Sequence, residues 1–309
     1  MFLDILTLAA GLVALVFAGD KLVEGAVALA TRLRISPLVV GLTVVAFGTS
    51  APELVISLEA ALGGQPGLAV GNVVGSNVAN VLLVLGAPAL IAPVACYQRG
   101  VSMSLYAMAG ITVVFMVMLT SGTLTRLDGL ILFAGLCAFI GWQLNAARRG
   151  RDVIAEEVSA GETTTRAMVI ALAIGVIGLP LGATLTIQGA TGIAERFGVS
   201  DAVIGLTVVA IGTSLPELMT TVIAAFKRSN EVAIGNVIGS NIFNIAAIMG
   251  ITAMVIPVPV PERIVGVDMW VMAAVTALLV GLTATRSTLT KPIGAAMLAG
   301  FVAYIVTAY

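Results

Sequence analysis

An internal duplication constrains the fold of this chain more than any other feature of its sequence. The segment GLTVVAFGTSAPEL at 41–54 recurs as GLTVVAIGTSLPEL at 205–218, and GNVVGSN at 71–77 recurs as GNVIGSN at 235–241. Both recurrences have an offset of 164 residues. Over 41–86 against 205–250 the alignment needs no gap and has 23 identities in 46 positions. Shared apolar composition alone does not produce such agreement, so the two halves are predicted to be copies of one structural unit.

The composition indicates a membrane protein. Hydrophobic residues make up 59% of the 309 residues, charged residues only 10%, and the mean hydropathy is +1.12; a soluble domain carries about 25% charged residues. A net charge of −1 argues against nucleic-acid binding. With no histidine and only two cysteines, the chain lacks the usual zinc ligands and the commonest catalytic base.

A membrane-spanning helix needs about 20 mostly apolar residues. We therefore predict an all-α integral membrane protein with ten spans. They are expected at 2–31, 36–62, 66–92, 100–120, 125–145, 166–196, 200–226, 231–256, 265–284 and 291–308.

Each half of the chain holds five predicted spans, at 1–145 and 166–309, with a charged linker at 146–165 between them. Because five is odd, the second half is expected to enter the membrane inverted relative to the first. Inverted repeats are typical of secondary transporters, whose binding site lies near the midplane where the repeats meet.

Basic residues predict the orientation, since they favour cytoplasmic loops. With both termini outside, the outer loops receive only Arg126, Arg196 and Arg263. The inner side, which includes the linker, then receives eleven basic residues: Arg32, Arg34, Arg99, Arg148, Arg149, Arg151, Arg166, Lys227, Arg228, Arg286 and Lys291.

The duplicated segments place a proline and a carboxylate within spans 2 and 7. Pro52 cannot donate to the carbonyl four residues back, so we expect helix 2 to be broken near 48–52 and helix 7 at the matching place. Glu53 and Glu217 adjoin the two breaks. A carboxylate at the centre of a span costs about 2.5–3.5 kcal/mol, and no basic residue is repeated beside these two. A bound cation is their natural partner.

Polar residues of spans 3 and 8 add further oxygen ligands. Asn72, Ser76 and Asn80 recur every four residues on one helix face, and the repeat presents Asn236, Ser240 and Asn244 in the same way. Carboxylate, hydroxyl and amide oxygens suit Ca²⁺ or Na⁺. Asn72, Asn77, Asn236 and Asn241 are interpreted as supporting residues. The pairs Gly71/Gly75 and Gly235/Gly239 are predicted to allow close helix packing.

The paired GTSxPE and GNxxGSN segments resemble the α-repeats of the cation/Ca²⁺ exchanger superfamily, in particular those of the prokaryotic sodium/calcium exchangers. The resemblance implies ten spans in two inverted halves, with the first and sixth spans, near Leu12 and Gly175, sliding to alternate access. Asn244 replaces the aspartate of potassium-dependent relatives, which favours a K⁺-independent exchanger and leaves the number of bound Na⁺ open.

The resemblance also implies a ligand set for Ca²⁺ and Na⁺. Its members are the carboxylates of Glu53 and Glu217, oxygens of Thr49, Ser50, Thr213 and Ser214, backbone carbonyls of Ala46 and Ala210, the Na⁺ ligands Ser76 and Ser240, and the central Asn80 and Asn244.

We therefore expect a Na⁺/Ca²⁺ antiporter of a bacterial-type inner membrane that normally expels Ca²⁺. Its partners would be the two ions and membrane lipid, with no cofactor, nucleic acid or obligate protein partner. A cation/H⁺ antiporter using the same glutamates is the main alternative, and a cation channel is a further one, although channels place their filters around a symmetry axis. A membrane enzyme is disfavoured because no nucleophile lies beside a base.

Overall fold

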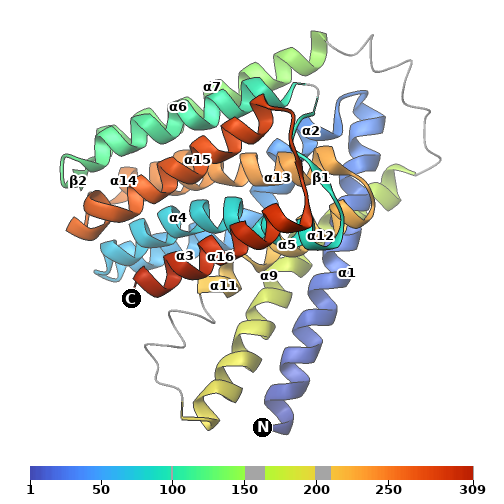
Figure 1. Ribbon diagram of the computed structural model, residues 1–309, viewed down its shortest axis with the longest axis horizontal. Helices are drawn as coiled ribbons and strands as arrows, with labels where there is room; N and C mark the ends of the chain where they lie inside the picture. The colour runs from blue at the N-terminus through green and yellow to red at the C-terminus, as the bar shows by residue number, and fades with distance from the viewer. Residues whose placement is uncertain (99, 150–163, 199–209, 309) are drawn as a thin grey trace.

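The computed structural model describes residues 1–98, 100–149, 164–198 and 210–308, and this part is helical apart from short strands and connections (Figure 1). Most of the predicted linker, and residues 200–209 of the predicted seventh span, lie outside the described residues. The elements of the first half are α1 (Phe2–Leu33), α2 (Pro37–Val40), η1 (Gly41–Val45), α3 (Ala46–Leu62), α4 (Pro66–Ala79), η2 (Asn80–Val84), α5 (Gly86–Ile91), β1 (Val94–Ala95), α6 (Val101–Leu119), β2 (Thr123–Leu124) and α7 (Arg126–Arg149).

The described part of the second half has a similar order, with an additional π-helical turn before its fourth long helix. Its elements are α9 (Thr165–Arg196), α11 (Ala210–Thr213), α12 (Leu215–Phe226), α13 (Asn230–Phe243), η4 (Asn244–Met249), α14 (Gly250–Val255), β3 (Val258–Pro259), η5 (Ile264–Asp268), α15 (Met269–Ala284), β4 (Thr288–Leu289) and α16 (Lys291–Ala308). The η segments are π-helical turns. Side-chain oxygens cap three helix starts among the described residues. Ser36 Oγ accepts from the Leu38 amide (3.1 Å) at α2, Thr125 Oγ1 from the Asp128 amide (3.2 Å) at α7, and Thr164 Oγ1 from the Ala167 amide (3.2 Å) at α9.

Eight helical stretches among the described residues are long and apolar enough to cross a membrane. They are Phe2–Leu33, Pro37–Leu62, Pro66–Ile91, Val101–Leu119, Arg126–Ala147, Thr165–Arg196, Asn230–Val255 and Ile264–Ala284. Two shorter apolar helices, Leu215–Phe226 and Lys291–Thr307, lie within the predicted spans 7 and 10. Large apolar side chains such as Phe2 and Val306 are more than 70% exposed, as expected of surfaces that face lipid.

The two longest helices, α1 and α9, lie side by side and extend away from the other helices (Figure 1). They run antiparallel, because Gly11 lies against Thr186 and Gly182 while Gly25 lies against Leu172. A Cβ atom on Gly11 would lie 2.5 Å from the Thr186 amide nitrogen, so only glycine allows this approach. The contact recurs with the halves exchanged, since Gly175 lies against Leu22 in the same way.

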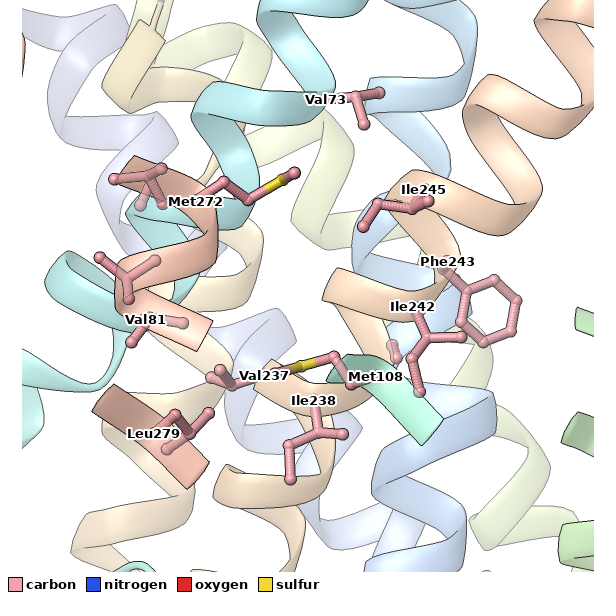
Figure 2. Close-up of a cluster of buried hydrophobic side chains, with 14 of the residues drawn as sticks. Val73, Val81, Met108, Val237, Ile238, Ile242, Phe243, Ile245, Met272 and Leu279 are labelled. Carbon is pink, nitrogen blue, oxygen red and sulfur yellow. The ribbon is translucent and has the colours of Figure 1, made fainter. Parts of the chain in front are cut away.

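The helix α13 occupies the centre of the remaining helices. Every residue from Val232 to Phe243 is buried, as expected of a helix that is covered on all sides. Figure 2 shows part of the surrounding core, where Val237 and Ile238 of α13 lie among side chains from other helices, including Met108 of α6 and Met272 of α15. This core includes residues of α3, α4, α12 and α13, the helices that carry the duplicated segments.

Short strands join the two halves, a feature that the sequence did not predict. Strand β1 pairs antiparallel with β4, and β2 pairs antiparallel with β3. In each pair one strand comes from the first half and one from the second. Cys96, which follows β1, adds a backbone hydrogen bond from its amide to the Ser287 carbonyl (3.2 Å).

The predicted break in span 2 is wrong. Helix α3 continues through Pro52 from Ala46 to Leu62. The irregularity lies one turn earlier in the π-helical η1, where the Ala46 amide bonds to the Gly41 carbonyl five residues back. A neighbouring π turn and packed helices let a membrane helix tolerate a proline without unwinding. Span 7 does break, because Ser214 (φ −86°, ψ 3°) separates α11 from α12.

Candidate functional site

Two buried carboxylates form the acidic part of the candidate site. Glu53 lies in α3 and Glu217 in the first turn of α12, and each is 1% exposed. The Ser50 hydroxyl donates a hydrogen bond to Glu217 Oε1 over 3.1 Å, which brings the duplicated GTSxPE segments together. None of the five ion pairs among the described residues involves either glutamate. The negative charge is therefore not neutralised by a basic side chain in the described part of the chain.

Two asparagines fix the backbone at these glutamates. Asn72 Nδ2 donates to Ser57 Oγ (2.9 Å) and to the Glu53 carbonyl oxygen (3.4 Å). The matching Asn236 Nδ2 donates to Thr221 Oγ1 (3.1 Å) and to the Glu217 carbonyl oxygen (3.3 Å). These bonds tie α4 to α3 and α13 to α12, in the supporting role that the sequence predicted for both asparagines.

Thr49 links the first duplicated segment to the second half. Its hydroxyl contacts Asn236 Oδ1 (3.2 Å), Ser240 Oγ (3.4 Å) and the Ala46 carbonyl oxygen (3.3 Å). The hydroxyl thus bonds back to its own helix and also reaches α13.

The close approach of α13 to the first duplicated segment requires glycine. A Cβ atom added to Gly239 would lie 2.6 Å from the Leu42 carbonyl oxygen, and one added to Gly235 would lie 2.8 Å from the Leu38 carbonyl oxygen. Close packing was predicted for Gly235 and Gly239, and the structure confirms it. No described residue of another helix lies within 4 Å of a Cβ on Gly71 or Gly75.

The central asparagines exchange hydrogen bonds across the two halves. Asn80 Nδ2 donates to Asn241 Oδ1 (3.1 Å), and Asn244 Nδ2 donates to Asn77 Oδ1 (3.3 Å). A π-helical turn begins at each donor, η2 at Asn80 and η4 at Asn244. Such turns occur often at functional sites, and the sequence analysis did not predict them here.

Five buried oxygens of the predicted ligand set have no hydrogen-bond partner among the described residues. They are Glu53 Oε2, Glu217 Oε2, Asn80 Oδ1, Asn244 Oδ1 and Ser214 Oγ. Buried polar atoms are nearly always hydrogen-bonded, and an unpaired one costs about 1–3 kcal/mol. Four of the five are acceptors only, because they are the oxygens of ionised carboxylates and of amides, which carry no hydrogen to donate. Carboxylate, amide and hydroxyl oxygens are the ligands that a hard cation prefers.

The remaining predicted ligands lie near these groups in the chain. Thr213 ends α11 and is buried, Ala46 begins α3, and Ala210 begins α11. Ser76 is buried on α4, one turn before Asn80, and its side chain makes no hydrogen bond to another described residue. The hydrogen bonds reported above therefore join Thr49 to Ser240 and Ser50 to Glu217, and none of them involves Ser76.

Sequence reasoning missed two methionines that contact the asparagines. Asn241 Nδ2 lies 3.6 Å from Met108 Sδ, and Asn77 Nδ2 lies 3.6 Å from Met272 Sδ. The signal was present, because the two methionines are separated by the repeat offset of 164 residues. They lie outside the segments of high identity, where an apolar residue in an apolar span is not distinctive.

The chain is similar to known proteins of one family. The family model described as sodium/calcium exchanger protein matches residues 3–145 and 167–309. The chain is 35% identical to the inner membrane protein YrbG of Escherichia coli over 320 residues, covering 100% of this chain and 98% of the relative. It is 30% identical to the sodium/calcium exchanger MaX1 of Methanosarcina acetivorans, covering 99% and 98% of the two chains.

The fold is also similar to a solved structure. The sodium/calcium exchanger from Methanococcus jannaschii superposes with a TM-score of 0.86 at 30% sequence identity. The match covers 99% of this chain and 98% of that one. The likeness therefore extends over both halves rather than over one motif.

Proposed function

Because this chain belongs to the sodium/calcium exchanger family, we propose that it is an antiporter that exchanges Na⁺ for Ca²⁺ at the site between Glu53 and Glu217. The family supports cation/Ca²⁺ exchange across a membrane, with Na⁺ and Ca²⁺ as the transported ions. The coupling to Na⁺, the net export of Ca²⁺ and the site residues are the proposal.

The observation that carries the proposal is the group of buried, unpartnered acceptor oxygens around two unpaired carboxylates in the described part of the chain. Hard oxygen ligands of this kind suit Ca²⁺ and Na⁺ and are poor for soft metals. The full ligand set is proposed to be Glu53, Glu217, Thr49, Ser50, Thr213, Ser214, Ser76, Ser240, Asn80, Asn244, Ala46 and Ala210, the last two through their carbonyl oxygens.

Charge explains why such a site would exchange ions rather than leak them. One Ca²⁺ or two Na⁺ neutralise the two carboxylates, whereas the empty site keeps two negative charges in a medium of low dielectric constant. Moving that charge across the membrane is costly, so the site reorients when it is filled. Steady cation flux without a counter-cation would contradict this mechanism.

We propose that access alternates because the halves 1–145 and 166–309 are inverted repeats of five spans each, joined by the linker 146–165. Contacts that recur with the halves exchanged support this arrangement. The contact of Gly11 with Thr186 corresponds to that of Gly175 with Leu22. The hydrogen bond from Asn80 to Asn241 corresponds to that from Asn244 to Asn77. The antiparallel pair α1 and α9 would slide over the other helices, which contain the site.

The membrane is proposed to be the bacterial-type inner membrane, with both termini outside. A relative that is 35% identical over the whole chain is named an inner membrane protein. The basic residues support the orientation, because eleven of them fall on the side of the linker and three on the other side.

The proposal is tested by ⁴⁵Ca²⁺ uptake into Na⁺-loaded proteoliposomes diluted into Na⁺-free buffer. Glu53→Gln and Glu217→Gln should abolish uptake. Glu59→Gln is the matched control, because Glu59 is a carboxylate of the same helix as Glu53 but lies outside the site and is not buried. Uptake that needs internal Na⁺ and is lost only in the two site variants supports the proposal.

Two alternative functions would give different results in this assay. Uptake that follows an imposed pH gradient and ignores Na⁺ would make the protein a cation/H⁺ antiporter that uses the same glutamates. Uptake that needs no counter-ion and does not saturate would make it a channel.

A further inference from the structure

Two chains of hydrogen bonds lead from the sulfur of a methionine to an amide oxygen of the site that has no described partner. In one, Asn241 Nδ2 contacts Met108 Sδ (3.6 Å), and Asn241 Oδ1 accepts from Asn80 Nδ2 (3.1 Å). In the other, Asn77 Nδ2 contacts Met272 Sδ (3.6 Å), and Asn77 Oδ1 accepts from Asn244 Nδ2 (3.3 Å). The free oxygens at the two ends belong to Asn80 and Asn244.

The chemistry of the thioether gives each chain a direction. An asparagine side chain has an NH₂ end that donates and a carbonyl end that accepts, and the two ends have nearly the same shape. A thioether sulfur has no hydrogen to donate, so the end of Asn77 or Asn241 that faces it must be the NH₂ end. The carbonyl end then faces the NH₂ group of the central asparagine. As a result, the carbonyl end of that central asparagine is the one left free.

The environment leaves these methionines little freedom to move. Met108 and Met272 are 0% and 1% exposed, and the four asparagines are at most 2% exposed. Figure 2 shows Met108 projecting from α6 and Met272 from α15 into the same buried cluster. In such surroundings water cannot replace a missing hydrogen-bond partner. The orientation of each central asparagine therefore depends on the asparagine that it bonds to, and the orientation of that asparagine depends on the methionine sulfur.

We propose that Met108 and Met272 are positioning residues that orient the amides of Asn80 and Asn244 so that both present oxygen, not NH₂, to the transported cation. The proposal rests on the proposed function, because it assumes that Asn80 and Asn244 face the cation. It extends the site to two apolar residues on α6 and α15, helices that supply none of the proposed ligands.

A reversed amide would oppose cation binding. If the thioether is removed, the NH₂ of Asn77 or Asn241 loses its acceptor, and the amide can turn over. The central amide can then turn as well, placing two N–H bonds where the cation lies. The orientation of the asparagine amides should therefore affect the affinity for the cation without affecting the movement of the filled site.

The test compares Met108→Leu, Met272→Leu and the double variant with Met269→Leu as control. Leucine has similar volume but no acceptor. Met269 is 3% exposed on the same helix as Met272, and its sulfur takes part in no hydrogen bond with another described residue. We expect each site variant to raise the Kd for Ca²⁺, measured by calorimetry on the purified protein, by about threefold to tenfold, the range of a lost hydrogen bond.

The maximal rate of Ca²⁺ uptake should stay at the level of the Met269→Leu control. Met108→Gln and Met272→Gln provide the rescue, because the glutamine carbonyl is an acceptor of similar reach, and they should bind Ca²⁺ more tightly than the leucine variants. Leucine variants that bind Ca²⁺ like the control, or glutamine variants no better than leucine, would overturn the proposal.

Measurements on the wild-type protein distinguish a failure of the proposed Na⁺/Ca²⁺ exchange from a failure of the methionine proposal. A wild-type protein that binds Ca²⁺ but does not couple its flux to Na⁺ contradicts Na⁺/Ca²⁺ exchange and leaves the methionine test intact, because that test measures binding. A wild-type protein that binds neither Ca²⁺ nor Na⁺ contradicts both.

Discussion

Ser50 donates a hydrogen bond to Glu217 across the boundary between the two halves, while the hydroxyl of its repeat counterpart Ser214 has no partner among the described residues. This contact does not recur when the halves are exchanged. It connects the segment that precedes Glu53 directly to the second carboxylate. In this conformation the two carboxylates therefore have different surroundings although their sequences match.

Replacing Ser50 should consequently destabilise the cation-free protein more than replacing Ser214. Ser50→Ala removes a hydrogen bond to a buried carboxylate, which is worth about 1.5–3 kcal/mol, whereas Ser214→Ala removes none to a described residue. We expect a melting temperature several degrees lower for Ser50→Ala than for Ser214→Ala in detergent without Ca²⁺ or Na⁺. Equal melting temperatures would mean that the Ser50–Glu217 bond does not contribute to stability.

Asn72 and Asn236, which hold the backbone at Glu53 and Glu217, should also differ in their contribution to stability. Asn236 is fully buried and its side chain makes three hydrogen bonds, to Thr49, Thr221 and the Glu217 carbonyl. Asn72 makes two and is partly exposed. Because each unpaired buried group costs about 1–3 kcal/mol, Asn236→Ala should lower the melting temperature more than Asn72→Ala. A lower melting temperature for purified Asn72→Ala than for purified Asn236→Ala would contradict this prediction.

Cross-linking can show which helices move together. Ala18 Cβ lies 2.8 Å from the position of a Cβ on Gly178, and a disulfide needs a Cβ–Cβ distance of about 3.8 Å, so cysteines at these positions of α1 and α9 can bond once the two helices separate by about 1 Å. If α1 and α9 slide as one body, this bond should leave Na⁺-driven Ca²⁺ uptake intact. The assay uses a background with Cys96→Ala and Cys137→Ala, and reduction of the bond serves as the control.

The contrasting link joins α1 to the site helices. A Cβ on Gly19 would lie 2.7 Å from Ile223 Cδ1 of α12. A cross-link between cysteines at 19 and 223, made with a short cleavable bifunctional thiol reagent, should block Ca²⁺ uptake, and cleavage of the cross-link should restore it. Uptake that survives this link would show that α1 does not move relative to α12.

Cys96 reports on the strand pair β1–β4. The side chain is fully buried, and burial raises the pKa of the Cys96 thiol to about 11. Since the thiolate is the reactive form, a raised pKa leaves the thiol protonated at pH 8 and lowers its reactivity. We expect no maleimide modification of Cys96 at pH 8 in the folded protein and complete modification after denaturation, as measured by mass spectrometry. Rapid modification of the folded protein would mean that β1 and β4 separate.

Much of the fold follows from the sequence because apolar length and duplication are local signals. The first span was predicted at 2–31 and observed at Phe2–Leu33, and the fourth was predicted at 100–120 and observed at Val101–Leu119. The carboxylates were predictable for the same reason: a glutamate in an apolar stretch is unusual, and finding it twice at the repeat offset is more so.

The features that the sequence analysis missed depend on contacts between distant segments. The effect of Pro52 was overestimated, because the π turn η1 and packing by α13 preserve the helix. The π turns that begin at Asn80 and Asn244 have no local sequence signature. Met108 and Met272 are ordinary apolar residues of apolar spans, and their contacts become visible only when α6 and α15 are placed beside α13 and α4.

The proposed function requires that Na⁺ and Ca²⁺ bind at one site between Glu53 and Glu217. Its most direct test is a calorimetric titration of the purified protein with Ca²⁺ at increasing concentrations of Na⁺, with K⁺ replacing Na⁺ to hold the ionic strength constant. We expect the apparent Kd for Ca²⁺ to rise steadily with Na⁺, and Glu53→Gln and Glu217→Gln to remove Ca²⁺ binding. A Kd for Ca²⁺ that is independent of Na⁺, or binding that survives in both variants, would contradict it.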